Sequence, residues 1–348
     1  MSDVKNMSKA NFIASAAALA LCAAATANAQ ETEPSQQTIA PEAAEGEMTV
    51  TLLGTGTPDP RIDRFGSSIL VNVAGQNLLF DAGRGSVIRL EQIGVSPGDI
   101  DQAFLTHYHS DHINGLADLW LTSRLPPHGN RQTPFPMTGP NGLQAIADGL
   151  ISAYQNDIGI READEKLAPE ASQFTVTEFG EDGVVYEKDG VRVTAFAVDH
   201  GELIDPSVGY RVDYGDHSVL LSGDTKKDDN LVANAEDVDL LIHEVGIAEP
   251  QMLENPAIQR ILDHHTTPAE AGEVFTEAAP QLAVYSHIVT LHPPGTPEQS
   301  AEEILAATRA TYDGPLLVGR DLMNFVISEE GVSQGFSGDP MKPRDEGG

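Results

Sequence analysis

Short apolar runs alternate along the chain with stretches whose apolar residues recur at helical spacing. The runs are rich in Val, Ile, Leu and Phe, and they predict β-strands at residues 48–53, 68–73, 78–80, 103–106, 191–198, 208–212, 218–222, 240–243 and 282–286. Helices are predicted at residues 142–156, 227–235, 268–277 and 297–310, and the last two begin with proline. This alternation predicts a layered α/β domain.

Two segments depart from this pattern. Residues 125–140 are rich in proline, and we expect a long surface loop there. At the N-terminus, Lys5 and Lys9 precede an apolar run that ends in Ala27-Asn28-Ala29, which is typical of a cleaved secretory signal over residues 1–29. The apolar run is too short to be a good membrane span. We therefore expect a periplasmic or secreted protein without a membrane span.

Composition divides the rest of the chain into three parts. Residues 30–47 contain Glu, Pro, Gln, Ala and Thr with little to bury, so a disordered linker is expected there. Residues 48–330 are expected to form one folded domain, since no repeat of fixed period is visible. Residues 331–348 are rich in Gly and Pro near their end and are expected to form a flexible tail.

The charge of the chain is strongly negative. Its 20 Lys and Arg stand against 53 Asp and Glu, which gives a formal net charge of −33. Such a charge repels the phosphate backbone of nucleic acids, so nucleic-acid partners are not expected. The single cysteine, Cys22, lies within the predicted signal and excludes a multi-cysteine metal site. Any metal must then be bound by histidines and carboxylates.

A dense cluster of such residues follows the predicted strand at residues 103–106. It contains His107, His109, Asp111 and His112. Because a loop at a strand end can turn these side chains in different directions, two can serve one metal while the others serve a neighbouring metal. The alternative is a solvated polar turn with fortuitous histidines, which fits a single histidine better than a cluster.

Three later strand ends each supply one further residue of a ligand type. They are His200, Asp224 and His287, which follow the strands predicted at 191–198, 218–222 and 282–286. Taken singly, His200 could cap a loop, Asp224 could begin a turn, and His287 could be a half-buried core imidazole. Their shared placement favours a catalytic zinc site, in which histidines and carboxylates leave one position for water.

Three further segments narrow this assignment: residues 52–58 (Leu-Leu-Gly-Thr-Gly-Thr-Pro), residues 79–85 (Leu-Phe-Asp-Ala-Gly-Arg-Gly) and residues 265–268 (His-Thr-Thr-Pro). Together with the His-x-His-x-Asp-His run they resemble the ribonuclease Z-like branch of the metallo-β-lactamase fold, which also includes exported arylsulfatases. The resemblance implies a four-layer αβ/βα sandwich with a dinuclear metal site at one edge. It implies two zinc ions as cofactors, and manganese and iron also suit such ligands.

The same resemblance assigns roles to single residues. One ion would take His107, His109 and His200, the other would take Asp111, His112 and His287, and Asp224 would bridge them. A bridging water would attack an ester phosphorus or sulfur, and Asp111 could take part in proton transfer. His265 corresponds to a catalytic histidine that is not a ligand, and its neighbour His264 is the rival for that role. Glu244 could orient His265.

For two residues outside the ligand set, two roles remain open. Asp81 could orient a ligand imidazole, or it could serve as a turn-forming residue before glycine. Arg84 could hold an anionic group of the substrate, or it could be a surface arginine.

Two enzyme functions compete within this family. A nuclease that processes transfer-RNA 3′ ends would need a protruding arm to grip RNA, and the candidate insertion at residues 151–188 has only Arg161, Lys166 and Lys188 as cations. We therefore expect an exported zinc-dependent hydrolase of small anionic esters, of the aryl sulfate or phosphodiester type. The alternatives are a ribonuclease Z-like endonuclease and a lactone hydrolase, with a metal-binding protein without turnover as a further class. A homodimer is also open.

Overall fold

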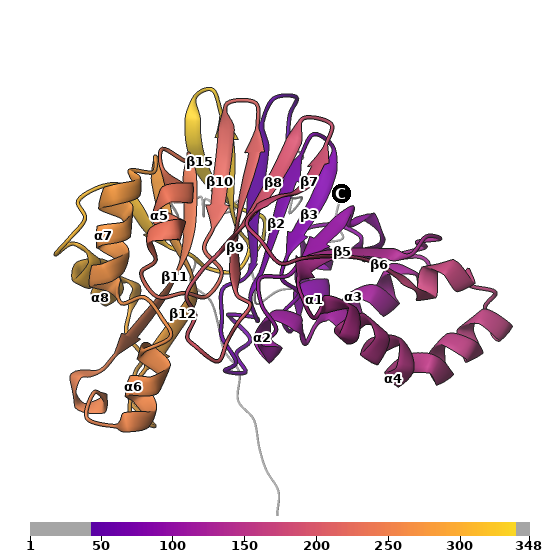
Figure 1. The fold of residues 1–348 in the computed structure, drawn as a ribbon, viewed down its shortest axis with the longest axis horizontal. Coiled ribbons are helices and arrows are strands. Elements are labelled where there is room, and N and C mark those ends of the chain that lie inside the picture. The colour runs from indigo at the N-terminus through magenta and orange to yellow at the C-terminus, as the bar shows by residue number, and fades with distance from the viewer. Residues whose placement is uncertain (1–42, 339–348) are drawn as a thin grey trace, which may run out of the picture. The chain divides into compact units, whose positions relative to one another are not determined.

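Two β-sheets packed face to face form the centre of the structure (Figure 1). The computed structural model describes residues 43–338. The first sheet has eight strands, in the order β15 (Gly331–Phe336), β14 (Met323–Ser328), β1 (Met48–Gly54), β2 (Ser68–Val73), β3 (Gln76–Phe80), β4 (Gln102–Phe104), β5 (Phe135–Pro140) and β6 (Phe174–Phe179). The second has seven strands, in the order β13 (Leu316–Val318), β12 (Leu282–Leu291), β11 (Leu240–Ala248), β10 (His217–Leu221), β9 (Val208–Tyr214), β8 (Val191–Ala197) and β7 (Gly183–Lys188).

Apolar side chains fill the space between the two sheets. Alternate residues of the strands face this core, and Val50, Phe104 and Val219 have no exposed surface. The rings of Phe80 and Phe104 stack with centroids 4.8 Å apart, and the Tyr210 ring of the second sheet lies 5.4 Å from that of Phe80. Burial of each large apolar side chain contributes about 1.5–3 kcal/mol, so this core holds the sheets together.

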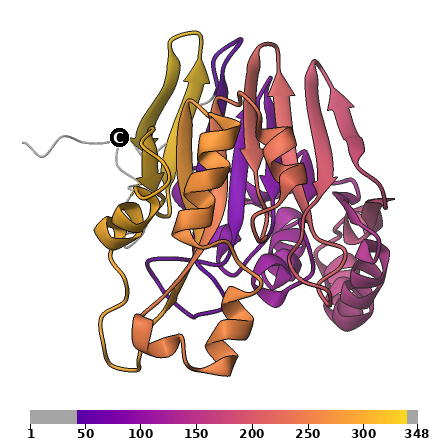
Figure 2. The same ribbon diagram turned by 60° about the vertical axis from the view of Figure 1, so that its left-hand side comes forward.

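Helices cover the outer faces of both sheets (Figure 2). The first sheet packs against α1 (Ser86–Gln92), α3 (Leu116–Ser123) and α4 (Leu143–Asp164), and the second packs against α5 (Asp229–Ala235), α7 (Pro268–Ala278) and α8 (Ala301–Thr308). Two short helices, α2 (Ser110–Ile113) and α6 (Pro256–Leu262), follow β4 and β11. Trp120 and Phe275 are fully buried in these outer layers. The predicted four-layer αβ/βα sandwich is confirmed.

Capping residues determine where the helices begin. α7 begins at the predicted residue, behind a capping box of Thr267 and Glu270. α8 begins later than predicted, because Ser300 and Glu303 form its capping box. α4 continues beyond its predicted end, where Arg161 forms ion pairs with acidic residues one turn away on either side.

The expectation of a surface loop at residues 125–140 is wrong for its second half. Phe135–Pro140 form β5, which lies between β4 and β6 in the first sheet. Phe135 and Met137 are fully buried, and Pro136 stands between them. The prolines masked the strand alternation of these two apolar residues. Gly331–Phe336, which composition assigned to the tail, form β15 and pair with β14.

Residues 151–188 do not form a separate arm. They comprise the end of α4, a 3₁₀ turn, β6 at one edge of the first sheet and β7 at one edge of the second. β6 pairs with β5 over six residues, and β7 pairs with β8. This segment therefore does not provide an arm that grips RNA. Its acidity also gives no information about RNA binding at other surfaces of the protein.

The predicted secretory signal at residues 1–29 lies outside the described residues, as does most of the predicted linker at residues 30–47. The predicted division of the chain into domains therefore stays a prediction. Within residues 43–338, no helix is both long enough and apolar enough to cross a bilayer.

A buried ion pair fixes the loop between β1 and β2. Asp321, just before β14, accepts hydrogen bonds from the backbone N–H groups of Thr55 and Phe65, at 2.9 and 2.8 Å. The guanidinium of Arg89 in α1 donates to the same carboxylate at 2.8 Å. The side chains of Arg89 and Asp321 are 1% and 0% exposed. Because a buried charge is costly unless it is paired, loss of either one leaves the other uncompensated.

We expect Asp321→Asn to lower the free energy of unfolding by about 3–5 kcal/mol, because the buried Arg89 guanidinium loses its counter-charge. Urea unfolding followed by circular dichroism measures the difference. Asp63→Asn is the matched control, since Asp63 lies on the same loop but pairs with Arg61 at the surface. It should change the value by less than about 1 kcal/mol. Equal effects would show that the buried pair does not hold the loop.

Candidate metal centre

The structure brings together all seven residues predicted as metal ligands. They come from the ends of four strands: His107, His109, Asp111 and His112 follow β4, His200 follows β8, Asp224 follows β10, and His287 lies within β12. His109 is exposed, and the other six are at most 5% exposed. The strand ends of both sheets therefore meet at one polar, largely buried centre.

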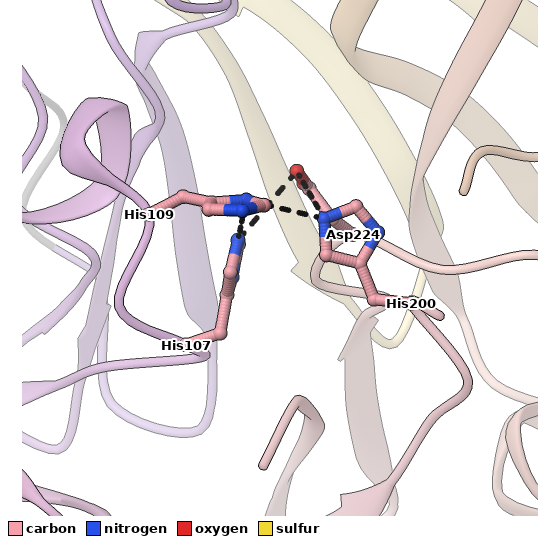
Figure 3. Close-up of side chains that lie close together, drawn as sticks. All are labelled: His107, His109, His200 and Asp224. Atoms are coloured by element: carbon pink, nitrogen blue, oxygen red, sulfur yellow. Dashed lines mark hydrogen bonds and ion pairs between the residues drawn. The ribbon is translucent and has the colours of Figure 1, made fainter. Parts of the chain in front are cut away.

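Four of these side chains form a first group (Figure 3). The Nδ1 atom of His109 lies 3.0 Å from Nε2 of His107 and 3.3 Å from Nε2 of His200. The Oδ2 atom of Asp224 lies 3.8 Å and 3.7 Å from the same two Nε2 atoms. The four ligand atoms lie within 4.8 Å of one another, which suits a single cation.

Asp111, His112 and His287 form a second group. The Oδ2 atom of Asp111 lies 3.2 Å from Nε2 of His287 and 3.6 Å from Nε2 of His112. Asp224 joins this group to the first, because its Oδ2 atom also lies 3.3 Å from Nε2 of both His112 and His287. One carboxylate oxygen thus faces four imidazoles.

Unpartnered buried atoms support a metal at this centre. Within residues 43–338, the Oδ1 atom of Asp224 and Nε2 of His112 are buried and make no hydrogen bond. Buried polar atoms in proteins are nearly always bonded. Imidazole and carboxylate ligands fit zinc, and they also fit iron and manganese. The site can therefore hold metal, while the number and identity of the ions stay predictions.

The backbone is strained at two positions of the site. His287 has φ 43° and Asp81 has φ 58°, which is the left-handed region that costs a residue with a side chain about 1–3 kcal/mol. At His287 the pairing of β11 with β12 shifts its register and passes over Ser286 and His287. This bulge is what points the His287 side chain at the centre.

Neighbouring groups hold the imidazoles in place. Oδ2 of Asp81 lies 2.7 Å from Nδ1 of His112, and Oδ1 accepts the backbone N–H of Thr106 at 2.9 Å. Nδ1 of His200 lies 2.9 Å from the backbone carbonyl oxygen of His264. Such contacts fix the tautomer and leave Nε2 free to bind metal. Asp81 therefore both orients an imidazole and occupies a turn conformation, so the two alternatives hold together.

Burial and charge set the protonation of the centre. Burial lowers the pKa of His107 well below its usual range and that of His200 to about 4, and it also lowers the pKa of His109. Neutral imidazole is the form that binds metal. Burial works to lower the pKa of His112 as well, but the neighbouring carboxylates, first Asp224 and then Asp81, outweigh burial and raise this pKa well above its usual value.

His265 lies beside Glu244, with Nδ1 3.2 Å from Oε2. Glu244 is held from its other oxygen, which accepts the backbone N–H of Thr266 at 3.0 Å. Burial works to lower the pKa of His265, but the Glu244 carboxylate outweighs it and raises the pKa to about 9. The rings of His264 and His265 both lie near that of His200, at 5.9 and 5.2 Å between centroids, but the ion pair with Glu244 is made by His265. Glu244 thus accompanies His265 and not its rival, while the catalytic roles of both residues stay predictions.

The centre opens into a cavity of about 650 Å³. Residues of both metal-ligating groups line it together with His265, and so do apolar residues such as Leu291 and Ile304. Arg61 and Arg64 also line it, and sequence analysis missed both of them. The available clue was two arginines in one short loop of a chain with few cations. Arg84, the predicted anion-holding candidate, is exposed and is not among the described residues that line the cavity.

Comparisons with known proteins agree with this geometry. Residues 48–254 match the family model of the Anti-Pycsar protein Apyc1. The chain is 34% identical over 277 residues to a ribonuclease Z of Mycobacterium bovis (strain BCG / Pasteur 1173P2), which covers 79% of this chain and 96% of that relative. Two solved structures share the fold. They are the metallo-β-lactamase fold protein YhfI of Bacillus subtilis (TM-score 0.60, 19% identity, 80% of this chain and 98% of that one) and human tRNase Z, short form (TM-score 0.59, 23% identity, 79% and 98%).

These relatives correct two expectations. A hydrolase of small anionic esters was expected, with nucleic acid excluded as a partner, and both expectations are wrong, because curated relatives that match most of the chain are ribonucleases Z. The exclusion rested on the net charge and on the acidity of residues 151–188. Net charge is a sum over the whole chain, and residues 151–188 are part of the sandwich. Neither the net charge nor the acidity of residues 151–188 describes the charge inside the cavity at the metal centre.

We expect His109→Ala to lose bound metal, because it removes an imidazole that faces His107 and His200. His265 also lies within reach of a cation together with Asp224 and His287, but its predicted role is that of a proton donor outside the ligand set. On that prediction, His265→Ala should keep its metal and lose about 10²–10⁴-fold in kcat. Mass spectrometry measures the metal content, and turnover of the dinucleotide ApA, whose leaving sugar oxygen needs a proton, measures the loss in kcat. The aryl diester bis(p-nitrophenyl) phosphate, whose leaving group departs without a proton, should lose much less. His264→Ala is the matched control and should retain metal and most of kcat. Equal metal loss in the His109 and His265 variants would make His265 a ligand.

Proposed function

This chain belongs to the ribonuclease Z-like family of the metallo-β-lactamase fold and to the family of the Apyc1 model, and we propose that it is a metal-dependent endonuclease that cleaves transfer RNA at its 3′ end. Hydrolysis of a phosphodiester is the reaction that the centre supports best. The names of the curated relatives and of the human neighbour support RNA as the substrate.

One observation carries the proposed reaction. The Oδ2 atom of Asp224 lies within 3.8 Å of an imidazole nitrogen in each of four histidines, two from the first sheet and two from the second. A carboxylate in this position can be shared by two cations. One cation would be held by His107, His109 and His200, and the other by Asp111, His112 and His287. Bound cations would supply positive charge that lowers the pKa of water and neutralises the phosphoryl oxygens.

The residues of the chain divide the proton transfers between them. Asp111 lines the cavity and, as an ionised carboxylate, can accept a proton from the attacking water. The water oxygen forms the new bond to phosphorus, and the bond from phosphorus to the leaving sugar oxygen breaks. His265 lines the same cavity, and the Glu244 carboxylate outweighs burial and raises its pKa to about 9, which favours the protonated form. It can therefore give its proton to the leaving oxygen.

We also propose that the chain is exported, since residues 1–29 combine Lys5 and Lys9, an apolar run and an Ala-x-Ala ending. The proposal of export does not depend on the proposal of RNA cleavage. If both are correct, the enzyme meets RNA outside the cytoplasm, and precursor transfer RNA is used below as a test substrate for the reaction.

We expect the metal-loaded protein to cut a precursor transfer RNA once, at the boundary of its 3′ trailer, and a chelator to abolish the cut. Denaturing gel electrophoresis of end-labelled RNA measures the position. Asp224→Ala should lose about 10³-fold or more, since it removes the oxygen that four imidazoles face. An intact precursor, with the aryl diester still turned over by the same preparation, would refute the proposal.

We expect the mature chain to begin at Gln30, because small residues precede the predicted cleavage site. N-terminal sequencing of protein from the periplasm and medium of a bacterial host measures this. Ala27→Asp with Ala29→Asp should leave the uncleaved chain, since the two changes remove the small-residue pattern. A full-length chain found only in the cytoplasm would contradict export.

A further inference from the structure

Arg64 has an unusual position among the cations of this acidic chain. It lines the cavity and is only partly exposed. Its Nη1 atom donates hydrogen bonds to Oγ1 of Thr55 at 2.7 Å and to the backbone carbonyl of Gly319 at 2.8 Å. Within residues 43–338, its Nε and Nη2 atoms make no hydrogen bond, and neither atom is sealed off from solvent. Two nitrogens of the guanidinium, with three N–H donors between them, thus have no partner among the described residues.

Other arginines of this region differ from Arg64. Arg61 is paired with Asp63 and Glu298, Arg89 is paired with Asp321, and Arg84 is exposed and does not line the cavity. Among the described residues, no carboxylate lies within 4.0 Å of the Arg64 nitrogens. Burial lowers the pKa of Arg64, because desolvation disfavours the charged guanidinium. An anion placed against its free donors would offset that cost, and arginine is suited to bind phosphate oxygens in pairs.

The cavity around Arg64 is larger than one phosphate requires. Its volume is about 650 Å³, and apolar side chains line part of it, among them Ile261, Leu291 and Ile304. A ligand pocket usually combines such apolar surface with a few placed polar groups. A nucleoside could occupy the apolar part while one phosphate lies at the metal centre and another meets Arg64.

We propose that Arg64 forms a second anion subsite, which binds the phosphate next to the one that is cleaved. This inference rests on the proposed function, because it assigns a place to the neighbouring nucleotide of the same strand. Arg64 is then a specificity-determining residue: it favours a strand with consecutive phosphates over a diester with only one. The hydrogen bonds from Nη1 hold the guanidinium in place, so that Nε and Nη2 form the binding edge.

Short probes isolate this contact. The dinucleotide ApA has one phosphate, and its 5′-phosphorylated and 3′-phosphorylated forms have two. We expect Arg64→Gln to weaken binding of at least one two-phosphate form by about ten-fold or more, and to weaken ApA binding by less than about two-fold. Titration calorimetry of the metal-loaded protein at fixed ionic strength measures Kd, and kcat/KM is measured in parallel. Arg64→Lys should recover part of the loss, since it keeps the charge but not the paired donors.

Arg84→Gln is the matched control, because it removes an exposed arginine of a neighbouring loop that does not line the cavity. It should leave the binding of every probe unchanged. An equal loss for all probes in Arg64→Gln would make Arg64 only an anchor of the loop and overturn the proposal, as would no loss at all or a wild-type protein that does not prefer the two-phosphate forms. Wild-type protein that leaves precursor transfer RNA intact but keeps the Arg64-dependent preference would refute the proposed function alone.

Discussion

The shared position of Asp224 is the constraint on which the rest of the site depends. Its Oδ2 atom lies 3.3–3.8 Å from imidazoles that follow β4 in the first sheet and from imidazoles carried by the second sheet. These contacts exist only if the two sheets are packed at one fixed offset. The apolar core between the sheets sets that offset. Phe104 of this core ends β4, just before the segment of residues 107–112 that carries four of the predicted ligands, and Val219 lies in β10, the strand before Asp224. The geometry of the metal centre is thus a consequence of core packing.

Local charge in the cavity differs in kind from the charge of the whole chain. The formal net charge of −33 is spread over 348 residues, and exposed charges more than about 8–10 Å away are largely screened at physiological ionic strength. The cavity is lined by carboxylates and by Arg61 and Arg64. Among the described residues, only Arg61 of these two arginines is ion-paired, and bound cations would add positive charge at the metal centre. An acidic surface disfavours non-specific contact with RNA without preventing a specific contact at a cationic site. This is why an argument from net charge failed to identify the substrate class.

The sequence predicts well which side chains meet at this centre, because their placement depends on local features. A strand period of two and the residue that follows each strand suffice to nominate His200, Asp224 and His287. The sequence does not predict Arg64, because its role depends on a hydrogen bond to Gly319, which is distant in the chain, and on there being no carboxylate within 4.0 Å among residues 43–338. The bulge that turns His287 depends equally on the pairing of β11 with β12. Long-range contacts decide these features, and composition misjudged β5 for the same reason.

The loop between β1 and β2, which carries Arg61 and Arg64, packs closely against the segment that carries the predicted ligand Asp111. A Cβ atom at Gly66 would lie 2.7 Å from the backbone nitrogen of Arg84 and 2.8 Å from the carbonyl oxygen of Asp111, and one at Gly83 would lie 2.4 Å from that same oxygen. Glycine is therefore required where the loop between β1 and β2 meets the segment after β3 and the segment of residues 107–112. The pair of Asp321 with Arg89 fixes the same loop from its other side. The segments that carry Arg64 and Asp111 are thus packed backbone against backbone, which fits a subsite for consecutive phosphates, since such a subsite needs its groups held at a defined spacing.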